Sequence, residues 1–148
     1  MIQRLILASM LMLASAAAWA GSLPRDVVLL ETSSSQYRFE VEVADDATER
    51  SAGLMGRAYL ADNAGMLFLY PDTRPVEFWM KNTPLALDIV FVREDGVIAH
   101  IAENTTPMSE DLIPSGEPVR AVLEVKAGTM RQLGVTAGDR LRNTTYFP

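Results

Sequence analysis

The chain has 148 residues, a formal net charge of −6 at pH 7, one histidine and no cysteine. The lack of cysteine excludes disulfide bonds and thiolate metal sites, and one histidine is too few for a multi-histidine zinc site. An acidic chain without a basic run repels a phosphate backbone, so we expect no nucleic-acid partner. A metal site would need oxygen ligands, and no acidic group has the spacing of an EF-hand loop, so we expect no resident metal and no cofactor.

Residues 1–20 have the pattern of a secretory signal peptide. A positive charge at Arg4 precedes an apolar run over 5–13, and Ala18-Trp19-Ala20 is a small-x-small cleavage pattern. The apolar run is shorter than the roughly 20 residues that span a bilayer. We therefore expect an exported protein that begins at Gly21, resides in the periplasm or outside the cell, and has no stable membrane insertion after signal removal.

The rest of the chain, 21–148, has the length of a single domain. The stretch 21–35 shows little periodicity and is interpreted as a flexible lead-in. Every second residue from 37 to 43 is apolar, which is the period of a strand with one face in water. This pattern predicts a strand over 36–44, at the start of one globular domain that covers 36–148.

A short helix and a buried strand are predicted next. Asp46 offers an N-cap oxygen, and Gly53 and Gly56 can end a helix, which together predict a helix near 46–55. The compact apolar run over 65–70 is followed at once by proline, so it predicts a buried strand.

The second half of the chain contains the clearest turn. Asp95-Gly96 lies between two apolar runs and supplies the positive φ angles of a tight hairpin. The proline-rich stretch 103–118 is interpreted as a long loop at the edge of a site. The patterns that follow predict a strand over 119–126, a short helix over 130–133 and a last strand near 140–146.

These elements together predict the fold class. Several short strands with only one or two helical turns favour a mainly β domain of the β-rich α+β type. We expect a compact, mostly antiparallel, barrel-like sheet with one or two short helices.

The segment FWMKNTPLALDIVF, residues 78–91, places polar and aromatic side chains in an otherwise apolar run. A four-residue turn would pair Lys81 with Ala86 and bring Trp79 opposite Asp88 on one face of a hairpin. This register predicts a small polar pocket. The alternative is that Asp88 is a core residue, bonded to backbone amides of the turn or paired with a basic side chain.

Further candidate residues lie outside this segment. Asp88 and Glu124 would form a carboxylate pair for acid and base chemistry if they faced one cleft, but a solvated Glu124 on a strand face is the commoner outcome. Arg50 and Arg57, seven positions apart, would bind an anionic group if they shared one side of a helix. Otherwise the two arginines cap carbonyls or pair with acids.

Five blocks of the sequence together resemble one protein family. The blocks are Glu49-Arg50 with Gly53-Leu54-Met55-Gly56-Arg57, Gly65-Met66-Leu67-Phe68, Phe78-Trp79-Met80-Lys81-Asn82-Thr83, Leu87-Asp88-Ile89, and Leu123-Glu124-Val125 with Ala127-Gly128. From about Tyr37 to Leu141 the chain resembles the domain of unknown function 192 family of prokaryotic, often exported proteins. The resemblance implies a compact, β-rich, barrel-like domain and no particular activity.

The family pattern also marks candidate binding residues. It falls on Arg50, Arg57, Trp79, Lys81, Asn82, Thr83, Asp88 and Glu124. At position 86 many members of the family carry proline, and this chain has alanine. The turn after Thr83 is therefore less rigid than the family pattern implies.

Three functions remain open. The first is an exported binding or accessory domain whose polar pocket, around residues 79–83, takes a small polar ligand or a component of the cell envelope. The second is a small hydrolase-like enzyme that uses Asp88 with Glu124 or Lys81, and the third is a purely structural domain. The first needs the fewest assumptions because no activated nucleophile or recognisable acid and base pair is visible, so we lean against an enzyme.

Overall fold

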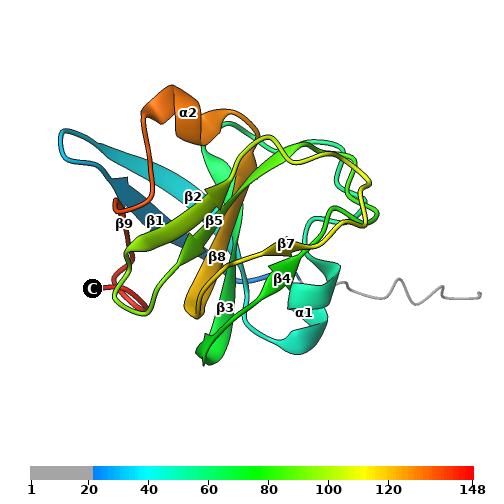
Figure 1. Ribbon diagram of the computed structural model, residues 1–148, viewed down its shortest axis with the longest axis horizontal. Coiled ribbons are helices and arrows are strands. Elements are labelled where there is room, and N and C mark those ends of the chain that lie inside the picture. Colours follow the sequence, from blue (N-terminus) through cyan, green and yellow to red (C-terminus); the bar gives the residue numbers. More distant parts are fainter. Residues whose placement is uncertain (1–21) are drawn as a thin grey trace, which may run out of the picture.

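The computed structural model describes residues 22–148 (Figure 1), and the predicted signal peptide lies outside them. Strands make up most of the ordered elements, and the two helices are short. In chain order the elements are β1 (Arg25–Glu31), β2 (Gln36–Ala44), α1 (Ala47–Ala52), β3 (Ala64–Arg74), β4 (Glu77–Phe78), β5 (Leu87–Val92), β6 (Ile98–Ala102), β7 (Ile113–Pro114), β8 (Val119–Lys126), α2 (Thr129–Leu133) and β9 (Arg140–Arg142). In this described part, no helix is long and apolar enough to cross a membrane.

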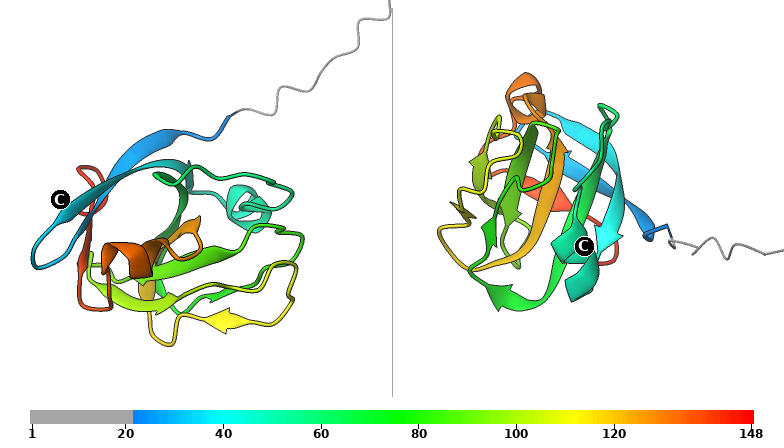
Figure 2. Two further views of the ribbon diagram at one scale, coloured as in Figure 1. Left: turned by 90° about the horizontal axis from the view of Figure 1, so that it is seen from above. Right: turned by 90° about the vertical axis from the view of Figure 1, so that its right-hand side faces the viewer.

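One large sheet organises the domain. It has seven strands in the order β6, β5, β8, β3, β2, β1 and β9, while β4 and β7 form a separate two-stranded sheet. Strand neighbours in the large sheet are antiparallel except β2 and β3, which run parallel. The large sheet curls into a half-barrel (Figure 2). The predicted class, a mainly β domain with a mostly antiparallel, barrel-like sheet and one or two short helices, is confirmed.

The two edges of the half-barrel meet at the β5–β6 hairpin. The amide of Ile98 donates to the carbonyl of Asp139 at 2.8 Å, and the amide of Leu141 donates to the carbonyl of Gly96 at 2.8 Å. Gly96 has a φ of 83°, the positive angle for which the Asp95-Gly96 turn was predicted. The hairpin prediction is therefore confirmed, and the hairpin tip also joins the two ends of the sheet.

Residues 25–31, which we predicted to be part of a flexible lead-in, form β1. The strand pairs with β2 on one side and with β9 on the other, and Val28 and Leu30 are fully buried. The prediction was wrong because 27–30 is an unbroken apolar run, partly covered on both faces, and such a run has no period of two.

Both faces of the central strands are buried. On one face, residues such as Leu67 and Leu123 belong to an apolar cluster that also includes side chains from β1, β2, β9 and α2. On the opposite face, Phe68 and Ile89 belong to a second cluster with Leu54, which follows α1. All six residues of β5 are buried, which explains why its sequence is a nearly continuous apolar run. The helices α1 and α2 lie at opposite ends of the sheet (Figure 1).

A capping box fixes the beginning of α1. The side chain of Asp46 accepts the amide of Glu49 at 2.8 Å, and the Glu49 carboxylate accepts the amide of Asp46 at 3.3 Å. Gly53, with a φ of 47°, ends the helix earlier than the predicted 46–55. None of the residues of α1 is buried. The helix is held against the sheet by contacts at its end, from Arg50 to the carbonyl of Leu69 and from the buried Leu54 that follows the helix.

Candidate functional site

The segment 78–91 does not form the predicted hairpin. Its first strand, β4, pairs with β7, while β5 pairs with β6 and β8. Between them, Met80 enters the core with 1% of its surface exposed, and Asn82 adopts a positive φ of 53° that turns the chain. The predicted register, with Trp79 opposite Asp88, is therefore wrong.

Asp88 is a structural residue at the centre of three backbone contacts. Its side chain is fully buried and accepts the amides of Asn104 at 2.9 Å, Gly128 at 3.1 Å and Met130 at 2.9 Å. The last two amides belong to the beginning of α2, which has no cap from its own N-cap side chain. Asp88 thus caps α2 and ties it to the loop after β6, as the core alternative proposed, although through other amides than those of the 82–85 turn.

Lys81 lies at the surface. Its Nζ is 3.2 Å from Oε1 of Glu110 and 5.0 Å from the centre of the Trp79 ring. Glu110 belongs to the predicted loop 103–118, which runs along this segment: the amide of Met80 donates to the carbonyl of Ser109 at 2.9 Å. The loop therefore lies beside the candidate segment, but none of its residues lines the cleft described below.

Asn82 and Arg57 serve local contacts. The carbonyl of Asn82 accepts the amide of Gly56 at 2.8 Å, which joins the turn after α1 to the 79–83 segment. Arg57 Nη2 is 2.9 Å from Oε2 of Glu42 on β2. Neither residue shares a cleft with the other candidates, so Arg57 follows the alternative in which an arginine pairs with an acid.

Glu124 is the most unusual carboxyl group of the domain. It is 4% exposed, and burial raises its pKa from 4.5 to about 8. No hydrogen bond or ion pair within residues 22–148 contributes to this pKa. The expectation of a solvated Glu124 beside basic neighbours is wrong, because both faces of β8 are covered and its neighbour Lys126 pairs with Asp62 at 2.7 Å.

The strand register decides the direction of Glu124. It lies opposite Met66 on β3 and Ile89 on β5, among residues of the second apolar cluster. Asp88 lies opposite Val125, and successive residues of a strand point to opposite faces. Asp88 and Glu124 therefore face apart, and the carboxylate pair of the hydrolase-like alternative does not form.

The Glu124 carboxyl group opens onto a cleft of about 440 Å³ between α1, β3, β4 and the 79–83 segment, here called the α1–β3 cleft. Every fully enclosed polar side-chain atom of the described residues has a hydrogen-bond partner. The unpartnered Glu124 oxygens must accordingly reach the cleft. The cleft is lined by Ala47, Arg50, Ser51, Ala52, Gly53, Leu54, Met55, Phe68, Tyr70, Arg74, Glu77, Phe78, Trp79, Thr83 and Glu124.

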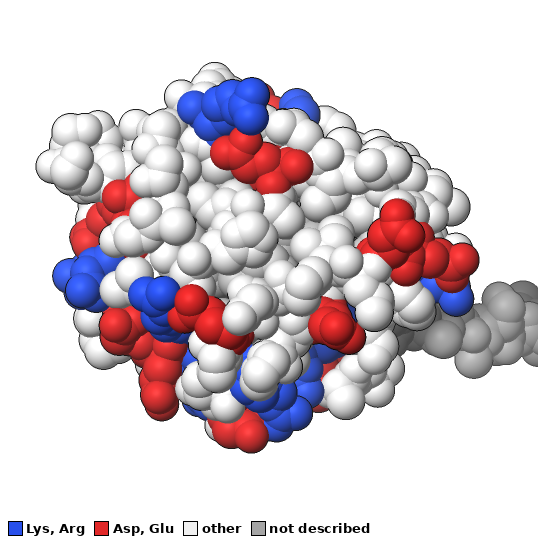
Figure 3. Space-filling view, in the orientation of Figure 1, with Lys and Arg blue, Asp and Glu red and all other residues white. Residues whose placement is uncertain are grey.

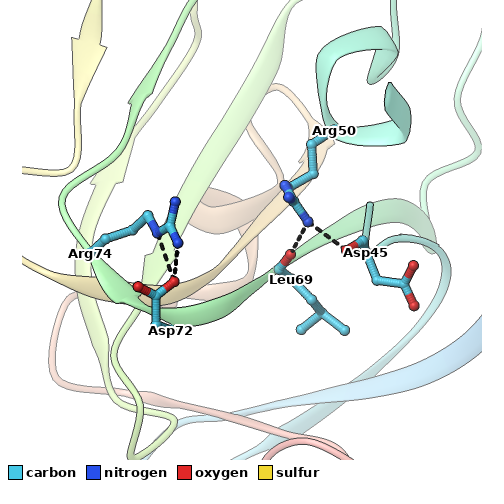
Figure 4. A network of polar contacts seen from close by, with 5 residues as sticks. All are labelled: Asp45, Arg50, Leu69, Asp72 and Arg74. Atoms are coloured by element: carbon cyan, nitrogen blue, oxygen red, sulfur yellow. Dashed lines mark hydrogen bonds and ion pairs between the residues drawn. The ribbon is translucent and has the colours of Figure 1, made fainter. Parts of the chain in front are cut away.

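Arg50 connects α1 to β3 at one end of this cleft. Its Nη1 donates to the carbonyls of Asp45 at 2.6 Å and Leu69 at 2.8 Å (Figure 4). The guanidinium group also lies over the ring of Tyr70, 5.1 Å from its centre. Arg50 lines the cleft, and its contacts are those of the predicted alternative in which an arginine caps carbonyls.

Tyr70 and Arg74 share this end of the cleft. Burial raises the pKa of Tyr70, whereas the charges of Arg50 and Arg74 lower it and Glu124 raises it, so all three groups lie close enough to act on the phenol. Arg74 pairs with Asp72 and extends toward Arg50 in Figure 4. Two guanidinium groups therefore approach the same space.

The cleft unites four of the predicted residues, Arg50, Trp79, Thr83 and Glu124, and omits Lys81, Asn82, Asp88 and Arg57. Tyr70 and Arg74 were missed. A signal for Tyr70 was present, because Met66, Phe68 and Tyr70 alternate along β3 on the same face of the sheet as Glu124. Arg74 comes three residues after Pro71, and we ended the predicted strand at 70, whereas β3 continues to Arg74.

Within residues 22–148, no group of three or more His, Asp or Glu side chains could hold a metal ion. The lining of the α1–β3 cleft contains two acidic residues, Glu77 and Glu124. The polar side chains of this cleft can donate and accept hydrogen bonds and can attract charged groups.

Comparisons with known proteins identify one family model and two similar solved structures. The family model of DUF192, described as "Uncharacterized ACR", matches residues 28–143. A crystal structure of a protein from Sinorhizobium meliloti, named as a candidate transcription regulator, has 48% sequence identity and a TM-score of 0.82, with 83% of this chain and 96% of that chain covered. A crystal structure of a protein of unknown function from Novosphingobium aromaticivorans has 36% identity and a TM-score of 0.81, covering 83% and 88%. No functionally curated protein matches the chain. The match over most of the chain shows that it belongs to the domain of unknown function 192 family.

Proposed function

We propose that this protein is a small-molecule-binding domain whose ligand occupies the α1–β3 cleft. The observation that carries the proposal is the unpartnered carboxyl group of Glu124. A buried polar group without a hydrogen-bond partner lowers the stability of a fold, and perturbed carboxyl groups in clefts are concentrated at functional sites. A ligand that hydrogen-bonds to Glu124 would supply the missing partner.

The size and lining of the cleft support a small ligand. Its volume of about 440 Å³ lies within the range of small-molecule sites, about 300 to 1,000 Å³. The lining combines aromatic rings with a few polar groups, a composition typical of such sites. The proposed site keeps Trp79 and Thr83 from the pocket predicted by sequence and shifts its centre to Glu124.

Export is part of the proposal. The signal-peptide pattern of residues 1–20 supports a protein that binds its ligand in the periplasm or outside the cell. Sequencing the first residues of the protein recovered from the periplasmic fraction tests this point. A start at Gly21 is expected, whereas recovery of the uncleaved chain from the cytosol would contradict export.

The Sinorhizobium meliloti relative is named as a candidate transcription regulator, so binding of nucleic acid is the function to weigh against ligand binding. In this chain the net charge is −6, and α1 and α2 have six and five residues. On the face in Figure 3, acidic and basic side chains lie interspersed, with no extended basic stripe. Phosphate contacts require such a concentration of lysine and arginine, so ligand binding in the cleft is the better supported function.

A ligand screen tests the proposal. The thermal unfolding of the purified protein would be followed across a library of small metabolites, and compounds that raise the unfolding temperature would be titrated by calorimetry. A bulky residue at the exposed position 52 of α1, Ala52→Phe, should fill the cleft mouth and abolish the response to these compounds. Ala137→Phe, at another exposed position outside the cleft lining, is the matched control. Binding that survives Ala52→Phe, or a library without any binder, would overturn the proposal.

A further inference from the structure

The polar groups of the α1–β3 cleft are mostly hydrogen-bond donors. Arg50 uses only Nη1 for its two carbonyl contacts, and its Nε and Nη2 have no partner within residues 22–148. Arg74 uses Nε and Nη2 for Asp72, which leaves its Nη1. The Tyr70 hydroxyl group donates to no described residue. These groups line one cleft and come from α1 and from two positions of β3. Figure 4 shows the two arginines with their partners.

The charges of the lining favour an anion. Arg50 contacts only backbone carbonyls and the Tyr70 ring, so no carboxylate in the described residues neutralises it. Arg74 is paired with the exposed Asp72. Glu77 is the acid that opposes them in the lining, since burial keeps Glu124 protonated and uncharged at neutral pH. A cationic ligand would meet two guanidinium groups here, and an anionic ligand would meet one exposed carboxylate.

Aromatic and aliphatic side chains occupy the rest of the lining. Phe68 and Phe78 pack edge to face, with their ring centres 5.1 Å apart, and Leu54 and the half-exposed Trp79 extend this surface. An apolar surface of this kind binds the hydrocarbon part of a ligand. A simple inorganic anion would leave it unoccupied.

Glu124 marks the inner end of the cleft. It lies opposite Met66, four residues before Tyr70 on β3, so it is separated along the strand from the end that holds Arg50 and Arg74. A protonated carboxyl group both donates and accepts a hydrogen bond. It therefore suits an uncharged oxygen or nitrogen of the ligand rather than a second charge.

Resting on the proposed function, we propose that the ligand is a small monocarboxylate with an aromatic or aliphatic body. Its carboxylate binds Arg50, Arg74 and the Tyr70 hydroxyl group at the outer end, and its body lies on Phe68 and Phe78. In ligands that carry a neutral polar group at the other end of the body, this group hydrogen-bonds to Glu124.

Matched probes test the charge preference. Phenylacetate, 4-hydroxyphenylacetate and hexanoate would be titrated into the protein and compared with the amide of each acid, with phenethylamine and with inorganic phosphate. The fluorescence of Trp79, the one tryptophan among the described residues, and calorimetry report binding. We expect at least one acid to bind about tenfold or more tightly than its amide, because hydrogen bonds to a charged group contribute more than neutral ones. Amide or amine binding as tight as acid binding would overturn the monocarboxylate proposal, as would phosphate binding as tight as acid binding.

A pair of arginine variants separates this site from unspecific attraction. Arg74→Gln should weaken binding of the acid about tenfold and leave the amide unchanged, since the removed charge contacts only the carboxylate. Arg38→Gln, which changes another exposed arginine that pairs with Glu40 outside the cleft, should change neither. An equal loss in both variants would overturn the site assignment.

The two proposals fail in different ways. Library compounds that bind in the cleft and are sensitive to Ala52→Phe, but include no acid preferred over its amide, would overturn the ligand class and leave the binding function intact. A library and probe set without any binder would overturn both.

Discussion

At the scale of single residues, Asp88 and Glu124 show how differently one fold treats two buried carboxyl groups. Asp88 is surrounded by three backbone amides, so burial leaves its oxygens fully bonded. Glu124 has no such partners, and burial raises its pKa to about 8. The first carboxyl group stabilises the domain, and the second lowers its stability at any pH at which an unfolded glutamate is ionised.

Replacing Glu124 by glutamine should therefore stabilise the protein in a pH-dependent way. Between the ordinary pKa of 4.5 and the raised value of about 8, the folded state keeps a proton that the unfolded state releases, so wild-type stability falls as the pH rises through this range. Glutamine mimics the protonated form and does not titrate. The free energy of unfolding of Glu124→Gln should match that of wild type near pH 4.5 and exceed it by a few kcal/mol above pH 8, at about 1.4 kcal/mol per pKa unit.

Denaturant unfolding at pH 5 and pH 8.5 measures this difference, and Asp88→Asn is the matched control of opposite sign. The asparagine removes a charged acceptor from backbone amides and should cost about 1.5 to 3 kcal/mol. A Glu124→Gln difference that does not change with pH would show that the Glu124 pKa is not raised.

The sequence identified both residues but not their roles. Hydrophobic neighbours predicted that Asp88 was buried, yet its partners come from 104, 128 and 130, which only the fold brings together. Alternation along β8 placed Glu124 on a polar strand face, because nothing local in the sequence indicates that α1 and the 79–83 segment cover that face. Site residues depend on such distant contacts, so they were predicted less well than strands.

At the scale of elements, the Asp95-Gly96 turn and the strands 36–44 and 119–126 were predictable because local chemistry fixes them. A positive φ at an Asp-Gly turn and the alternation of apolar and polar side chains along a strand both depend only on neighbouring residues. The predicted hairpin across 82–85 does not form. Asn82 adopts a positive φ that turns the chain, and all six residues of β5 are buried, so β5 pairs with the buried strand β8 and not with β4.

The β5–β6 turn should tolerate no side chain at Gly96. A Cβ atom there would lie 2.7 Å from the carbonyl oxygen of Leu141, in addition to the strain of a φ of 83°. Gly96→Ala should lower the free energy of unfolding by about 1 to 3 kcal/mol. Gly116→Ala, with a φ of 78° and no atom within 4 Å of the added Cβ, has the strain without the clash.

Urea unfolding of the two variants separates these contributions. We expect Gly96→Ala to be clearly the less stable of the two, because it also disturbs the contact between the hairpin and β9. Equal losses would mean that the contact with Leu141 adds nothing to stability.

At the scale of the whole molecule, β1 completes the core of the half-barrel. Leu30 is fully buried in the cluster that also contains residues of β9 and α2. Leu30→Ala should lower the free energy of unfolding by about 2 to 5 kcal/mol, the usual range for a buried leucine. Leu112→Ala, at a position that is 59% exposed, should change it little.

Thermal and denaturant unfolding of the two leucine variants provide the comparison. If Leu30→Ala lowers the free energy of unfolding no more than Leu112→Ala does, residues 25–31 do not contribute to the core.

The joining of β1 to β9 also has a consequence for the rate of folding. Glu31 and Arg142 make an ion pair at 2.7 Å although 111 positions separate them, and β2 pairs in parallel with β3 across the whole of α1. Contacts between distant parts of a chain require large loops to close before they contribute any stability, so we expect folding on the millisecond to second scale rather than in microseconds. Residues 138–142 pair with β1 and with the β5–β6 hairpin, so a chain in which they are detached leaves both edges of the curled sheet unpaired and open to pairing with other chains.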